Sequence, residues 1–384
     1  MRRLLLFCCL FAPLLPSRAT SPSVPSHDMH LLNEKVSITS TSYVDLSQPS
    51  GVETGVYEGV TGVFVSSCGT NKIHFFATTA GCEDTNSCIV QSVAGSGVSG
   101  VTNGDFETAA LSSPSRMVYL AQQDVLVVAD RAHGLLRYLD MASRYLGTVV
   151  SPAGDFVTLV ANAVGDGNGD LDVKVCGDHL YVSDSRNVYN LTGADGTLAG
   201  AFTAGAVLTQ YSALNTWLIL NTHDTGQPNP VVQTIAVNSK SNSLYVGYTH
   251  ASGVIVEVPL ECSDFSAIRV LSSAIESFSP VTFPLHMVYV AADDALYWVE
   301  GRRPHVRRRD NKHGTGTVVR LLRFADEGTG LDGCDCADLA CSCGEVESFV
   351  GKASDEDGTN THTRLQDSQP LSISVSAAKS GPVM

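Results

Sequence analysis

The strongest signal along this chain is an alternation of apolar and polar residues that recurs in five short runs. Each run holds branched or aromatic apolar residues and ends on a small or polar residue. The runs are "GVFVSS" from Gly62, "VLVVAD" from Val125, "HLYVSD" from His179, "SLYVGY" from Ser243 and "ALYWVE" from Ala295. Alternation with a period of two predicts β-strands, and one unit repeated about every 50 residues predicts a radial or solenoid array. The predicted fold class is therefore all-β.

The second unit shows the expected strands most clearly. Pro114 and a Gly-containing loop come before a strand over 117–121, and a polar turn over 122–124 comes before "VLVVAD". The run "GLLRYLD" then alternates, and a short turn separates it from "RYLGTVV". Four strands with turn residues between them predict one antiparallel sheet.

These motifs resemble the NHL repeat, whose copies each form one blade of a β-propeller. The repeat runs from a Gly-rich loop through "A-x-L-x-x-P" to "lyVaD" and then to "n-x-I-r". The second unit matches it at Ala110, Leu111, Pro114, Val128, Ala129, Asp130, Leu136 and Arg137. The resemblance covers about residues 55–378 and implies a single β-propeller of four-stranded antiparallel blades.

The irregular region over 201–221 leaves two blade numbers open, five and six. The segment "QPLSISVSAAKSG" over 369–381 reads as a strand with no partner after it. If this strand joins the N-terminal strands, the ring closes by mixing both ends of the chain, which removes exposed sheet edges. We therefore expect a closed propeller.

Residues 1–19 have the pattern of a signal peptide, since Arg2 and Arg3 precede an apolar stretch over 4–15. A membrane span needs about 20 apolar residues, and no segment of the chain reaches that length. The sequence predicts a protein without a membrane span that is secreted or resides in the lumen of the secretory or endosomal pathway.

The rest of the chain divides into two parts. Residues 20–54 are rich in Ser, Thr and Pro and predict a flexible N-terminal segment. The predicted propeller domain covers 55–384 and contains a basic loop over 301–316 and a Cys-rich loop over 325–345.

The chain has 39 acidic and 24 basic residues and a net charge of −15. This charge opposes binding to nucleic acid, so we expect no nucleic-acid partner. The basic loop "GRRPHVRRRDNKHGTG" is the exception and is expected to be a solvated tip. There are two alternatives. The loop contacts a polyanion through Arg307, Arg308 and Arg309, or it is cleaved by a protease specific for basic residues.

The loops after the second strand of each blade share one face with the loops that enter each blade. We expect this face, termed the loop face, to carry polar side chains that bind a ligand. An Asp at the end of "VAD" or "VSD" is alternatively expected to cap its own turn by accepting backbone N–H bonds. The Arg and His residues have no such local role. The predicted binding residues are Asp130, Arg131, His133, Asp184, Arg186, His250, Arg307, Arg308 and Arg309.

The string "DGNGDLD" over 166–172 places oxygen-bearing side chains at alternate positions, a spacing that suits calcium. It lacks the bidentate Glu of an EF-hand loop, so a plain Gly-rich turn is the favoured alternative. The calcium candidates are Asp166, Asn168, Asp170 and Asp172.

Nine of the eleven cysteines lie beyond the signal peptide, which holds Cys8 and Cys9, so at least one thiol lacks an intramolecular partner. Seven are expected in loops between third and fourth strands and are disulfide candidates in an oxidising compartment. Zinc is the alternative for the Cys-rich loop, although its cysteine pairs are too closely spaced for a structural zinc site. The disulfide candidates are Cys82, Cys88, Cys262, Cys334, Cys336, Cys341 and Cys343.

Asn190 begins the chain's one N-x-[ST] acceptor for N-glycosylation, "NLT". It falls within an expected strand of the third blade. Modification therefore requires an exposed edge on that strand.

Together these features predict a non-enzymatic binding scaffold for a protein or a glycan, since no nucleophile elbow, phosphate loop or metal triad appears. The alternative is a metal-dependent lyase or hydrolase. The secreted peptide-amidating lyases are propellers of the same repeat type with a catalytic Arg in an "ADR" turn, and "VADRAHG" is similar to it, which implicates Arg131. That resemblance also implies zinc bound by three His, for which the chain offers His133, His179, His223, His250 and His286. No cofactor is expected apart from the calcium or zinc of these alternatives.

Overall fold

The computed structural model describes residues 46–77, 90–159, 171–211, 214, 231–238, 240–250, 252–260, 268–273, 284–290, 295–300, 318–323 and 346–350. Within these ranges the chain is almost entirely β-structure, with one four-residue helix, α1 (Gly200–Thr203), and one 3-10 turn, η1 (Arg131–His133). The strands form four antiparallel sheets of four strands and one of five. None of the helices in the described part of the chain is long and apolar enough to cross a membrane.

The sheets follow one another along the chain, and in each of them sequential strands are neighbours, except that β5 pairs with β9. The first sheet holds β1 (Pro49–Tyr57), β2 (Val60–Ser67), β3 (Lys72–Ala77) and β4 (Val90–Ala94). The second holds β5 (Gly104–Asp105), β6 (Pro114–Leu120), β7 (Val125–Asp130), β8 (Leu135–Asp140) and β9 (Tyr145–Thr148). The third holds β10 (Asp172–Cys176), β11 (His179–Ser183), β12 (Val188–Gly193) and β13 (Ala206–Gln210). The fourth holds β14 (Val231–Asn238), β15 (Ser243–His250), β16 (Ser252–Pro259) and β17 (Arg269–Ser273), and the fifth holds β18 (Pro284–Val290), β19 (Ala295–Glu300), β20 (Val318–Arg323) and β21 (Val346–Val350).

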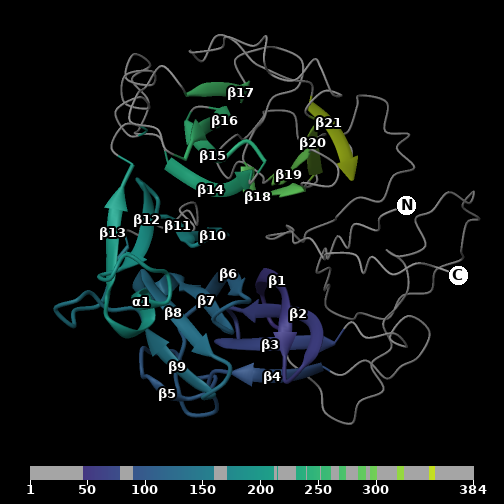
Figure 1. Cartoon of the computed structure of the whole chain (residues 1–384). Coiled ribbons are helices and arrows are strands. Elements are labelled where there is room, and N and C mark those ends of the chain that lie inside the picture. The colour runs from purple at the N-terminus through teal and green to yellow at the C-terminus, as the bar shows by residue number, and fades with distance from the viewer. Residues whose placement is uncertain are drawn as a thin grey trace, which may run out of the picture.

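The five sheets are arranged around a common centre (Figure 1). The first strands β1, β6, β10, β14 and β18 lie innermost. β1 contacts β6, β6 contacts β10, β10 contacts β14 and β14 contacts β18. Later strands lie progressively further out. This arrangement of antiparallel meanders is that of a β-propeller.

Apolar side chains fill the space between successive sheets, which explains the period-two alternation. In β7, Val125, Val127 and Ala129 pack in the cluster shared with the third sheet. The side chains between them, Leu126 and Val128, pack in the cluster shared with the first sheet. Successive side chains of a strand point to opposite faces, so a sheet between two neighbours buries both sets.

The sequence-based strands of the second unit are confirmed in β6 to β9. Two other expectations need correction. β1 begins at Pro49, inside the segment 20–54 that was expected to be flexible, so the first sheet has an innermost strand of its own. Part of the irregular region 201–221, offered as a sixth blade, is instead β13, the outer strand of the third sheet. The strand expected over 369–381 lies outside the described residues.

Candidate functional site

The turns after second strands lie beside the segments that lead into first strands, as the repeat implies. In the second sheet the Arg131 backbone N–H donates to the Ser113 carbonyl at 3.3 Å. In the first sheet the Cys68 N–H donates to the Gln48 carbonyl at 3.1 Å. The Ser185 carbonyl of the third sheet accepts from Val232 of the fourth at 3.2 Å. The two kinds of segment therefore share one face in the first and second sheets, and this loop face continues from the third sheet to the fourth.

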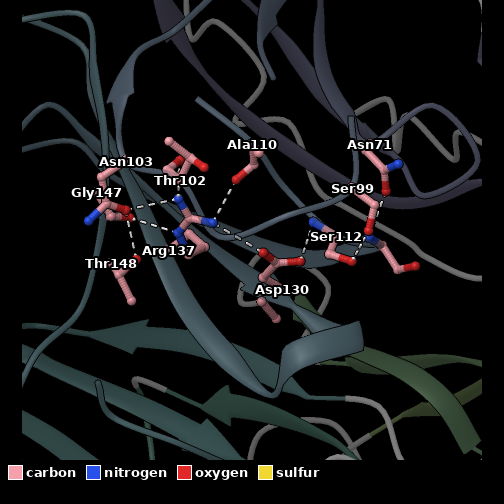
Figure 2. Close-up of polar contacts among 12 residues, drawn as sticks. Asn71, Ser99, Thr102, Asn103, Ala110, Ser112, Asp130, Arg137, Gly147 and Thr148 are labelled. Atoms are coloured by element: carbon pink, nitrogen blue, oxygen red, sulfur yellow. Dashed lines mark hydrogen bonds and ion pairs between the residues drawn. The ribbon is translucent and has the colours of Figure 1, made fainter. Parts of the chain in front are cut away.

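Asp130, at the end of β7, is completely buried and does not cap its own turn. Its Oδ1 accepts a 2.7 Å hydrogen bond from the Ser112 N–H, and its Oδ2 lies 3.3 Å from Nη1 of Arg137 (Figure 2). Burial raises the pKa of Asp130 to about 6, although the Ser112 N–H and the Arg137 charge lower it. This aspartate ties the second sheet together and is not a surface ligand.

Arg137, in β8, uses its guanidinium to join three segments of the second sheet (Figure 2). Besides Asp130, it donates to the carbonyls of Ala110 at 2.7 Å and Thr102 at 3.1 Å. It also donates to the Gly147 carbonyl at 3.2 Å and to Oδ1 of Asn103 at 3.0 Å. All five of its N–H donors therefore have acceptors, which explains how a charge can be fully buried here.

Asp184, in contrast, does cap its own turn in the third sheet. Its Oδ1 accepts from the N–H groups of Arg186 at 2.8 Å and Asn187 at 2.7 Å. Its Oδ2 accepts from the Tyr189 hydroxyl at 3.3 Å. Strand register places Tyr189 where Arg137 stands in the second sheet, so the two sheets hold equivalent aspartates by different partners.

The basic residues of the loop face lie at the surface. Arg131 is half-buried in η1, His133 is exposed in the same turn, and Arg186 is exposed in the next sheet. His250 ends β15, where the structure describes only the backbone. Arg307, Arg308 and Arg309 lie outside the described residues.

The candidate residues for disulfides, calcium binding and glycosylation are not grouped in one site. The seven disulfide candidates and Asp166, Asn168 and Asp170 lie outside the described residues. The two cysteines that the structure does describe, Cys68 and Cys176, are not joined in a disulfide. Asn190 lies in β12, which pairs with β11 on one side and β13 on the other, so this strand has no exposed edge at Asn190. Asp172 is fully buried at the centre of the molecule.

A polar cluster that was not predicted from the sequence lies at the propeller axis. We term it the axial cluster, and its members are Glu53, Arg116, Asp172, Lys174, Thr234 and His286. Strand register places Arg116, Asp172, Thr234 and His286 at equivalent positions of four innermost strands, with Gly51 at the fifth. A side chain at Gly51 would overlap the Ser115 carbonyl of β6, so glycine lets β1 approach closely. Four of these five strands also carry a bulge beside this position, which redirects side chains.

Asp172 is the centre of the cluster. Its Oδ2 accepts from the Thr234 hydroxyl at 2.7 Å and from the Ile235 N–H at 3.0 Å, both in β14. Its Oδ1 accepts from the Val173 N–H at 2.9 Å and lies 3.2 Å from Nζ of Lys174. With its oxygens engaged in this way, Asp172 is held as part of the fold.

Lys174 extends the cluster to the fifth sheet, because its Nζ lies 2.7 Å from Nε2 of His286. Burial, with the charges of Lys174 and Arg116, holds the pKa of His286 well below its usual value. His286 is therefore neutral at neutral pH, and its Nε2 can accept a hydrogen bond from the ammonium group.

Glu53 adds a carboxyl group from the first sheet. Its Oε1 accepts a 3.3 Å hydrogen bond from the Tyr119 N–H of β6. Burial raises its pKa to about 7, against the charge of Lys174 and the Tyr119 hydrogen bond, which lower it. The axis therefore holds an acid that titrates near neutral pH.

Of the His residues offered for the zinc site that the lyase resemblance implies, the three whose side chains the structure describes do not lie together. His133 is exposed on the loop face, His179 bonds to Asn190 at 3.1 Å, and His286 lies at the axis. In the described part of the chain no three His, Cys, Asp or Glu side chains are grouped as metal ligands would be.

Comparisons with known proteins assign no family to this chain. No protein-family model matches the sequence, and no curated protein matches it. Among solved structures, the chain is similar to a nidogen/laminin complex (11% identity, 66% of this chain and 73% of that chain, TM-score 0.40). It is also similar to a gluconolactonase from Xanthomonas campestris (14%, 72% and 73%, 0.41) and to Kuenenia stuttgartiensis hydrazine synthase (10%, 81% and 68%, 0.44). Because these TM-scores are low, the assignment of the fold rests on the sheets of this chain and not on the similar structures.

Proposed function

We propose that this chain is a secreted, NHL-type β-propeller of five or six blades that binds an anionic region of a protein or glycan through its loop face. The binding is non-enzymatic. The observation that carries the proposal is that, in the turns after β7 and β11, the acidic side chains are oriented inward and the basic ones outward.

The sequence places acidic and basic residues side by side in these turns, but only the basic ones reach the surface. Asp130 and Asp184 have 0% exposure, because Arg137 and local N–H groups bind them. His133 and Arg186 are exposed and Arg131 is half-buried. The accessible charge of the turns is thus positive although the chain carries a net charge of −15, and such a patch attracts anions.

The basic loop extends this charge pattern. It connects β19 to β20 and so joins a second strand to a third, the same connection that holds Arg131 and Arg186 in their sheets. Its arginines would add to the positive potential at this end of the propeller. A sulfated glycan or an acidic protein segment is the ligand that such a face would select.

The test is retention of the full chain on immobilised heparin, measured as the NaCl concentration needed for elution. Arg186→Ser and a triple Arg307/Arg308/Arg309→Ser variant should elute at lower salt than the wild type, because each loses contacts to anions. The matched control is Lys240→Ser, which removes one exposed positive charge from a first-to-second-strand turn on the opposite face. Equal elution of all four proteins would refute binding through the loop face.

A further inference from the structure

Solvent reaches the axial cluster at two of its charged side chains. The Lys174 side chain is 18% exposed, and Glu53 is partly exposed. Arg116, Asp172 and His286 are almost completely buried around them. Among the described side chains of the cluster, Lys174 and Glu53 are therefore the ones that a small solute can contact.

Neither charge is needed for packing the innermost strands. Glu53 pairs with Phe64 in the first sheet, and Lys174 pairs with Tyr181 in the third. Phe64 and Tyr181 occupy the same position of their second strands. Register places aliphatic residues at the position of Glu53 and Lys174 in the other three innermost strands: Val118, Ala236 and Val288. Because the fold accepts small apolar side chains here, a lysine and a glutamate at this level indicate a role in binding.

The Lys174 ammonium group retains capacity to bind. It has three N–H donors, and its partners among the described residues are Oδ1 of Asp172 at 3.2 Å and Nε2 of His286 at 2.7 Å. His286 is neutral, and Asp172 also accepts bonds from Val173, Thr234 and Ile235. One donor and part of one positive charge therefore remain for an acceptor from solvent.

We propose that Lys174 binds a singly charged oxyanion, a carboxylate or sulfate-ester group of a small molecule, at the propeller axis. Glu53 is the neighbouring group that takes up a proton when the anion binds. A doubly charged phosphate is disfavoured, because the site offers one accessible cation beside two carboxyl groups. This site does not depend on the loop face, so either proposal can fail alone.

The proton uptake follows from the groups that face Glu53. Lys174 and Asp172 of β10 act on it through their charges, and Tyr119 of β6 donates its N–H. Arg116 of β6 and His286 of β18 complete the ionisable groups of the cluster. Because a bound anion adds negative charge beside Glu53, it binds best when Glu53 is protonated. Affinity should then fall as the pH rises above about 7.

The experiment uses the full chain and three probes, namely acetate, methyl sulfate and inorganic phosphate, each against NaCl at equal ionic strength. Calorimetric titration and the shift in melting temperature are measured at pH 6, 7 and 8. For the wild type, binding of acetate and methyl sulfate should weaken by up to about tenfold between pH 7 and 8, the limit for one linked proton. At pH 8, where inorganic phosphate is mainly doubly charged, it should bind more weakly than acetate.

Two variants locate the site. Lys174→Met keeps the aliphatic stem and should weaken acetate binding at least about tenfold, as loss of a charged hydrogen bond implies. Glu53→Gln should bind acetate with the same affinity at pH 6 and pH 8. Lys240→Met, on an exposed turn, should bind as the wild type does, and urea midpoints show whether each variant is folded.

Several results would overturn the proposal. The first is wild-type affinity in Lys174→Met, and the second is an unchanged pH dependence in Glu53→Gln. The third is tighter binding of phosphate than of acetate at pH 8. The fourth is the absence of any anion-specific effect in the wild type and Glu53→Gln at all three pH values. Because Glu53→Gln removes a charge without removing volume, it keeps the test decisive even if Lys174→Met does not fold.

Discussion

The Thr234 hydroxyl donates a 2.7 Å hydrogen bond to Oδ2 of Asp172, a residue 62 positions earlier in an adjacent sheet. The same hydroxyl accepts a 2.9 Å bond from the Met287 N–H of the sheet that follows. One side chain therefore links β10, β14 and β18. In a ring of separate sheets, such links add to the apolar packing that holds neighbouring sheets in register.

Thr234→Val should destabilise the protein by about 1–3 kcal/mol, because valine has the same shape but leaves the buried Asp172 carboxylate without one of its donors. The free energy of unfolding in urea measures this. The matched control is Thr209→Val in β13, where the side chain is exposed. A loss no larger than that of Thr209→Val would mean that the link between sheets contributes little.

Much of the fold could be predicted from the sequence, because each sheet is buried on both faces and its second strand is therefore strongly apolar and alternating. The second strands of all five sheets coincide with the recurring runs. β1 was missed because Gly51, Glu53 and Gly55 interrupt its alternation. β13 was missed because most of its residues are exposed, so the apolar signal is weak.

The candidate sites were less predictable. The turns that carry Arg131 and Arg186 follow from the repeat, but the sequence could not show that Asp130 turns inward toward Arg137. The axial cluster was missed because its members are single polar residues in apolar strands far apart in sequence. The available signal was register. Val52, Met117, Val173, Ile235 and Met287 pair with the same position of their second strands. Arg116, Asp172, Thr234 and His286 stand directly before this position in their strands, and Glu53 and Lys174 stand directly after it.

Arg137→Met should destabilise the protein by about 3–5 kcal/mol, because it leaves the buried Asp130 charge and several carbonyls without their donor. Arg144→Met is the control. Arg144 is 45% exposed and pairs with Glu58 at 2.7 Å and Glu107 at 2.9 Å, both exposed. Exposed ion pairs contribute about 0–1 kcal/mol, so its loss should be much smaller. Similar urea midpoints for the two variants would contradict the role given to Arg137.

Tyr189→Phe tests the equivalent position of the third sheet. The hydroxyl accepts from Nδ2 of Asn187 at 2.9 Å and donates to Asp184 at 3.3 Å. Because Asp184 keeps its two backbone donors, the expected loss is about 1 kcal/mol, well below that of Arg137→Met. Tyr138→Phe is the control, since the Tyr138 hydroxyl has no hydrogen-bond partner among the described residues. A loss as large as that of Arg137→Met would show that the two aspartates depend equally on their neighbours.

The pH dependence of stability tests the burial of Glu53. Its pKa is raised from the usual 4.5 to about 7 in the folded protein, so between these values the folded state holds a proton that the unfolded state has lost. Stability should therefore fall as the pH rises from about 4.5 to about 7 and then level off. Other carboxyl groups also titrate in this range, so the quantity to compare is the difference in unfolding free energy between the wild type and Glu53→Gln. That difference should change steadily across the window in favour of Glu53→Gln, since glutamine has no charge to desolvate. A constant difference would mean that Glu53 titrates in the folded protein as it does in water, and that the axis is open to solvent at this side chain.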